Sequence, residues 1–224
     1  MLENETEVFS SPFEHYFWCL PNGSEPPKAI ASRPEFQIVY GVPDGATLPT
    51  NSIVFLDDLQ HEQGLRTQLL YTVHSHHRNL TVVSLNHNLF PKNRFQRDLS
   101  QSTKYIIACN NPRDAQAFFR LALQLEPGRA RSLYECYLDA CKKPFGYLLC
   151  DLTQQVHPAL RYKTGLFETD GGLTVYCTDE DLQQLVREDG GYERFCEREH
   201  APYGGADSFE QGPSHGFAED PEPE

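Results

Sequence analysis

Residues 51–59 read NSIVFLDDL, in which four apolar residues lead directly into Asp57, Asp58 and a leucine. A short, β-branched run of this kind is typical of a buried strand in a parallel sheet. The carboxyl ends of parallel strands face the ligand crevice, so both carboxylates are expected where a nucleotide and its metal would bind. The string is equally compatible with an aspartate that begins a turn or caps the next helix.

A second polar cluster follows the next expected strand. Residues 80–90 read LTVVSLNHNLF, so Asn86, His87 and Asn88 should lie at the same carboxyl edge as the two aspartates. P-loop ATPases place the residue that senses the terminal phosphate at this point. Mg²⁺ prefers oxygen ligands, often through water, and a second carboxylate can orient the attacking water. We therefore interpret residues 53–58 as a Walker B strand.

Apolar runs of strand length recur along the chain with helical stretches between them, which predicts an α/β fold with a mainly parallel sheet. The expected strands are residues 15–20, 36–40, 53–56, 80–85, 105–109 and 146–150, with a short one at 173–177. The expected helices are residues 63–76, 114–125, 129–142 and 179–188. In the first helix Leu65, Leu69, Leu70 and Val73 recur at helical spacing, which predicts one apolar stripe on the sheet.

Four collinear segments resemble the HerA/FtsK-type P-loop ATPases, in particular the poxvirus-type genome-packaging ATPases and relatives in virus-like mobile elements. The segments are IVFLDDL, HSHHRNLTVVSLNHNLFPK, the SQSTKY run leading to NNPRDAQ, and CKKPFGYLLCDLTQ. The resemblance covers roughly residues 13–167. It implies a three-layer, RecA-like and mainly parallel sheet that binds ATP and Mg²⁺.

The resemblance also implies roles by position. Asp57 resembles the metal-associated Walker B aspartate, which holds Mg²⁺, and Asp58 resembles the acidic residue that activates water. Asn86 and His87 fall where the family's sensor, commonly a Thr-Gln pair, lies. Two departures stand out by position: a histidine replaces the glutamine, and Asp58 is shorter than the glutamate usual in the wider superfamily.

The sequence has no match to G-x-x-x-x-G-K-[ST], the loop whose backbone N–H groups cradle phosphates and whose lysine reaches the outer ones. In the family this Walker A loop and its strand precede the segment that corresponds to residues 9–20. We therefore expect an N-terminally truncated core that lacks the P-loop strand. Because that strand is central, an open gap or edge in the sheet is predicted unless another segment fills it.

Basic residues near the sensor strand are further candidates. Arg94 and Arg97, with Lys92, follow that strand in a polar loop. Three interpretations stay open for them: an arginine acting in a neighbouring subunit's site, a contact to the DNA backbone, or a solvated loop. Arg78 is a further candidate for a neighbouring subunit's site.

Charge and cysteine usage limit the class of protein. The formal net charge is −13, and residues 188–224 carry 11 acidic residues against two arginines. We therefore divide the chain into a partial P-loop ATPase-like domain, 1–187, and an acidic disordered tail, 188–224. Seven cysteines without a C-x-x-C pair, and no signal or membrane segment, favour a nuclear or cytoplasmic protein with reduced thiols that is not secreted.

No zinc, haem or flavin is expected. For zinc the reason is that His74, His76 and His77 lie too close in sequence to close a tetrahedral site, and no suitably spaced cysteine pair completes it. Two functions remain. The first is an ATPase subunit of a DNA-translocating ring, inactive alone without Walker A, with double-stranded DNA, other copies of itself and capsid proteins as partners. The second is a non-catalytic remnant or interaction module that keeps the ATPase fold.

Overall fold

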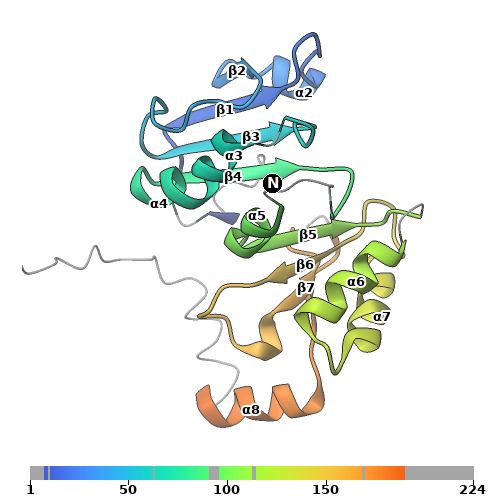
Figure 1. The fold of residues 1–224 in the computed structure, drawn as a ribbon. Coiled ribbons are helices and arrows are strands. Elements are labelled where there is room, and N and C mark those ends of the chain that lie inside the picture. The colour runs from blue at the N-terminus through green and yellow to red at the C-terminus, as the bar shows by residue number, and fades with distance from the viewer. Residues whose placement is uncertain are drawn as a thin grey trace, which may run out of the picture.

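The computed structural model describes residues 8–9, 11–62, 64–90, 96–112, 115–167 and 170–189. In this part the chain forms two four-stranded sheets flanked by helices (Figure 1). The first sheet is parallel throughout and the second is antiparallel throughout. The predicted α/β class is confirmed, whereas the prediction of a mainly parallel sheet is right for the first half and wrong for the second.

The parallel sheet has the strand order β2-β1-β3-β4. Its strands are β1 His15–Leu20, β2 Phe36–Tyr40, β3 Ser52–Asp57 and β4 Leu80–Leu85, and the helix α2 Lys28–Ala31 precedes β2. Asp57 of β3 stands opposite Leu85 of β4. The expected strands therefore begin and end within about a residue of the observed ones, the margin by which such boundaries usually differ.

The strand β3 is buried on both faces and on both edges. Alternate residues supply two separate hydrophobic clusters, one with Val54, Leu56 and Leu70, the other with Ile53, Phe55 and Trp18. Since both faces are covered, the strand needs a continuous apolar run instead of alternation. Ser52 to Leu56 are all buried, and Asp57 is the first residue of β3 with solvent access.

The helical segment after β3 presents a different face to the sheet from the one predicted. It consists of α3 Leu65–Leu69, the π-helical turn η2 Leu70–His74 and α4 Ser75–His77. Leu70 and Thr67 are fully buried, whereas Leu65, Leu69 and Val73 are 60%, 37% and 37% exposed. The prediction of one sheet-facing stripe is therefore right for Leu70 and wrong for Leu65, Leu69 and Val73. Residues four apart share a face, and here that face points away from the sheet.

The antiparallel sheet has the order β5-β6-β7-β8. Its strands are β5 Tyr105–Cys109, β6 Tyr147–Asp151, β7 Tyr162–Thr164 and β8 Thr174–Tyr176. The helices of this half are α5 Gln96–Ser102, α6 Ala115–Leu125, α7 Ala130–Ala140, the 3-10 turn η3 Pro158–Leu160 and α8 Asp179–Asp189. Two packed helices, α6 and α7, separate β5 from β6, so the chain leaves and returns at the same end of the sheet and β6 runs antiparallel.

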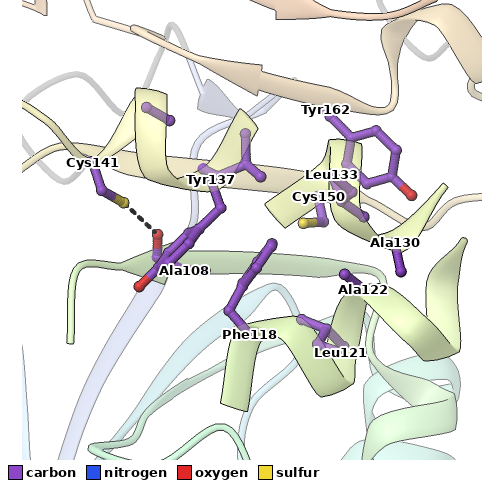
Figure 2. Close-up of a cluster of buried hydrophobic side chains, with 12 residues drawn as sticks. Ala108, Phe118, Leu121, Ala122, Ala130, Leu133, Tyr137, Cys141, Cys150 and Tyr162 are labelled. Carbon is purple, nitrogen blue, oxygen red and sulfur yellow. Dashed lines mark hydrogen bonds between the residues drawn. The ribbon is translucent and has the colours of Figure 1, made fainter. Parts of the chain in front are cut away.

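A second core holds α6 and α7 on the antiparallel sheet (Figure 2). The rings of Phe118 and Tyr137 stack with centroids 4.1 Å apart and planes 11° apart. The Tyr137 hydroxyl also donates a hydrogen bond to the Cys109 carbonyl at 3.0 Å. This core is therefore separate from the two clusters around β3.

The two sheets are separate in hydrogen-bond pairing within the described part of the chain. Among the described residues, no backbone hydrogen bond connects β4 to β5, although both strands run in the same direction in Figure 1. The Asp58 N–H donates to the Leu85 carbonyl at 3.2 Å, so the backbone groups of Val82 and Ser84 face away from β3. Among the described residues these groups have no strand partner, and the gap left by a missing P-loop strand stays a prediction.

None of the helices in the described part of the chain combines the length and hydrophobicity that crossing a bilayer requires. The nuclear or cytoplasmic location remains a prediction. The acidic tail, 188–224, lies almost entirely outside the described residues, and α8 ends at Asp189.

The reversed helix face predicts unequal effects of two similar substitutions. Leu70→Ala should lower the free energy of unfolding by about 2–5 kcal/mol, because it opens a cavity under the sheet. Leu65→Ala should change it by less than about 0.5 kcal/mol, because that side chain is already in water. Urea denaturation of the two variants measures the difference, and equal losses would contradict the observed orientation of α3.

Candidate functional site

The acidic pair and the polar end of β4 lie at one edge of the parallel sheet. Asp57 is the last residue of β3, Asp58 follows it, and Asn86 and His87 follow β4 directly. Because β3 and β4 are parallel neighbours in register, both segments leave the sheet at its carboxyl edge. The arrangement predicted for these four residues is confirmed.

Asp57 is held by the only tryptophan of the chain. The indole Nε1–H of Trp18 donates to Asp57 Oδ2 at 3.2 Å. Trp18 is buried, and its ring stacks on Phe55 with centroids 5.1 Å apart. A buried indole N–H usually finds an acceptor, and here the acceptor is the candidate metal ligand. The residues expected at the site from the sequence do not include Trp18, although a tryptophan on the adjacent strand, opposite the residue two before Asp57, is a usable signal.

Asp58 has an unusual backbone conformation. Its φ angle is +52°, in the left-handed region that non-glycine residues rarely adopt. Its N–H still belongs to the β3–β4 ladder through the Leu85 carbonyl, while its side chain is 50% exposed. Backbone strain of this kind, on the order of 1–3 kcal/mol, concentrates at functional sites. The conformation turns the chain directly after Asp57, so two successive aspartates both reach the edge.

His87 faces Asp58. The distance from His87 Nε2 to Asp58 Oδ1 is 3.9 Å, and the imidazole is 81% exposed. An exposed pair of this kind typically contributes less than about 1 kcal/mol, so it orients the two groups more than it stabilises the fold. Asn86 differs, since its Oδ1 accepts a hydrogen bond from Ser84 Oγ at 3.2 Å.

The loop that carries His87 is tied to the antiparallel half. Asn111 Nδ2 donates to the His87 carbonyl at 3.4 Å, and the Asn111 N–H donates to the Tyr137 hydroxyl at 3.3 Å. The acidic edge is therefore connected to the second core through one asparagine, even though the strands β4 and β5 are not paired.

The alternative interpretation of the two aspartates receives partial support. Asp58 does sit in a turn, as its φ angle shows. The next helix, α3, begins after Gly64 at its N-cap position, so neither aspartate caps it. A turn residue that also points a half-exposed carboxylate at the edge of the sheet is compatible with ligand binding.

The basic and histidine candidates are placed differently. Arg94 lies outside the described residues, and Arg97 lies on α5 with a side chain that is also outside them. Arg78 Nε donates to the Leu48 carbonyl of its own chain at 3.0 Å, which leaves its assignment to a neighbouring subunit without support. His74 ends the π-helical turn, and a Cβ at Gly45 would come within 2.6 Å of its ring, so this imidazole packs closely on a loop.

The carboxylates at the edge are suited to one mode of metal binding. In the described part of the chain no group of three or more His, Cys, Asp or Glu side chains is arranged to hold a metal ion. Mg²⁺ does not need one, because it usually keeps several waters and takes one or two carboxylates together with phosphate oxygens. Asp57 and Asp58 at an accessible edge fit this mode and do not fit a closed structural site.

Buried thiols are not candidates for catalysis. Burial raises the pKa of Cys19 and of Cys150 to about 12, so both remain protonated and behave as small packing residues. Cys109 differs from these two, because it is exposed at the last position of the edge strand β5.

A cavity of about 90 Å³ lies in the antiparallel half, far along the chain from the acidic edge. Its lining includes Glu126, Arg129, Tyr162 and Asp181, and neither Asp57 nor Asp58. Arg129 Nη1 contacts Asp181 Oδ2 at 2.7 Å, and this hydrogen bond raises the pKa of the guanidinium. The charges of this cavity therefore satisfy each other.

Comparisons of the chain with protein-family models, with curated proteins and with solved structures found no match. The function of the chain is therefore inferred from the geometry of the acidic edge.

The strained conformation of Asp58 predicts an inverted glycine effect. Asp58→Gly should be more stable than Asp58→Ala by about 1 kcal/mol, because only glycine adopts the left-handed region without steric cost. At Asp57, which is extended, the order should reverse, with Asp57→Ala the more stable variant. Thermal unfolding of the four variants provides the measurement. If the alanine variant is the more stable one at both positions, Asp58 is not strained.

Proposed function

We propose that the chain is a P-loop ATPase-like subunit related to the HerA/FtsK-type genome-packaging and DNA-translocating motors, and that it supplies the metal-side half of a nucleotide site. The observation that carries the proposal is the placement of Asp57 and Asp58 at the carboxyl end of a fully buried central strand, beside the polar end of its parallel neighbour. This is the position at which open parallel sheets bind ligands.

Each side chain has a distinct part in the proposed site. Asp57, held by Trp18, would bind Mg²⁺ directly or through a water. The chemistry that a bound Mg²⁺ would supply is positive charge to offset the charge that develops on the phosphate. Asp58 would orient the attacking water, and His87 lies 3.9 Å from it, where the family's sensor is expected. Arg94 and Arg97 are proposed as contacts to phosphate in a neighbouring subunit or to the DNA backbone.

The open edge of β4 supports the same proposal. The central P-loop strand that the resemblance implies would need a partner strand, and the outward backbone groups of Val82 and Ser84 would pair with it. The break between β4 and β5 is where such a strand would fit. A RecA-like core completed in this way would bring the phosphate-binding loop to the edge that already holds Asp57 and Asp58.

A non-catalytic role is the second candidate, and a specific observation favours it. The sequence contains no Walker A loop. Strand edges without a partner readily pair with another polypeptide, and among the described residues β4 has no partner on the side away from β3. In this case the chain would bind double-stranded DNA, capsid proteins or other copies of a motor subunit without hydrolysing ATP.

The chain alone should show little or no ATP hydrolysis. The phosphate loop normally supplies both the amide cradle and the lysine, and without them the two aspartates face a polyanion. At about 4 Å each such repulsion costs roughly 1 kcal/mol even in water, so nucleotide affinity should be weak. The measurement is ATPase turnover and ATP affinity of the 224-residue chain, of Asp58→Asn, and of a version extended upstream by a phosphate loop.

Turnover that appears only in the extended version and disappears on Asp58→Asn is the expected result for a motor subunit. No turnover in either version, with DNA or partner binding retained, would favour the non-catalytic role. Substantial turnover by the 224-residue chain that Asp58→Asn abolishes would show that the missing loop is not needed.

A further inference from the structure

A buried glutamine lies directly beside the acidic edge. Gln60 is 8% exposed, two residues beyond Asp58. Glutamine is mostly found at the surface, and burying its amide is unfavourable unless both polar atoms find partners. In the described part of the chain its Oε1 has none. A buried acceptor without a partner costs about 1–3 kcal/mol, so packing does not account for this side chain.

The other half of the amide contacts the proposed water-orienting carboxylate. Gln60 Nε2 donates to Asp58 Oδ1 at 3.4 Å. The opposite amide orientation would place two acceptor oxygens against each other, so the nitrogen is the atom that must face Asp58. The orphaned Oε1 is thus the consequence of directing the N–H toward the carboxylate.

Both neighbours of Asp58 act on the same oxygen. His87 Nε2 and Gln60 Nε2 approach Oδ1 at 3.9 Å and 3.4 Å, from β4's loop and from the segment after β3. Among the described residues, no hydrogen bond or ion pair involves Asp58 Oδ2. A half-exposed aspartate has several accessible rotamers, and two contacts on one oxygen select those that leave the other oxygen open.

We propose that Gln60 is a positioning residue that holds the Asp58 carboxylate by Oδ1 and leaves Oδ2 available, where it would face the proposed Mg²⁺ site. The inference rests on the proposed function of the acidic edge and adds a residue that neither the sequence segments nor the Walker B pattern marks. It also explains the orphaned Oε1, because residues that serve a site are often retained at a cost in stability.

The test separates stability from cation binding in one variant. Gln60→Met keeps the length of the side chain and removes both polar atoms. Its free energy of unfolding should be unchanged or higher, because the unsatisfied Oε1 is gone. Its affinity for Mn²⁺, used alone as a stand-in for Mg²⁺ and followed by electron paramagnetic resonance, should fall about tenfold, the lower end of what losing a ligand-orienting residue costs.

Two comparisons complete the design. Gln124→Met, on the exposed face of α6, should leave both quantities unchanged. In an Asp58→Asn background, Gln60→Met should cause no further loss of Mn²⁺ affinity, because the two residues act as one unit. Gln60→Leu serves as a second apolar replacement and should behave like Gln60→Met.

The possible failures are distinguishable. If the wild-type chain binds no Mn²⁺, or binds it equally after Asp57→Asn and Asp58→Asn, the proposed function fails and the role of Gln60 fails with it. If the wild type binds Mn²⁺ and Asp58→Asn abolishes binding, but Gln60→Met binds as the wild type does, only the role of Gln60 is overturned. Unfolding of both Gln60→Met and Gln60→Leu would also overturn it, by showing that the amide is structural.

Discussion

The burial of β3 between β1 and β4 is the constraint on which the acidic edge depends. Five residues from Ser52 to Leu56 have almost no access to water, and burying apolar side chains of this size contributes about 1.5–3 kcal/mol each. A strand fixed so firmly cannot slip in register, since a shift by one residue would carry charged groups into the core. Asp57 and Asp58 are therefore held at one edge by the residues before them.

The rest of the site depends on weaker interactions. Trp18 joins the core to the edge, because the same ring that stacks on Phe55 donates to Asp57. Asp58 is strained, half exposed and contacted by His87 and Gln60. The buried strand β3 contributes stability, whereas the strained Asp58 at its end contributes to the proposed site at a cost in stability. It also concentrates the energetic cost of the site in Asp58 and Gln60.

The sequence predicted the parallel sheet and its carboxyl edge best. The strand limits and the shared edge of Asp57 and His87 follow from apolar run length and parallel pairing. The sheet-facing side of α3 does not, because periodicity shows that Leu65, Leu69 and Val73 share a face without showing where it points. The direction of β6 depends on the packing of α6 against α7, and no sequence pattern marks Gln60. Neither feature could therefore be predicted from the sequence.

Paramagnetic broadening of amide signals by Mn²⁺ in a ¹⁵N-labelled chain tests whether the edge formed by Asp57, Asp58 and His87 binds a hard divalent cation. The competing binder is acid elsewhere in the chain, such as Asp179 to Asp181 at the start of α8 and the residues after 189. We expect the amide signals of Asp57, Asp58 and His87 to broaden at the lowest Mn²⁺ concentrations, and we expect Asp57→Asn to remove this broadening. Broadening that begins at α8 or in the acidic tail and leaves Asp58 unaffected would contradict this expectation.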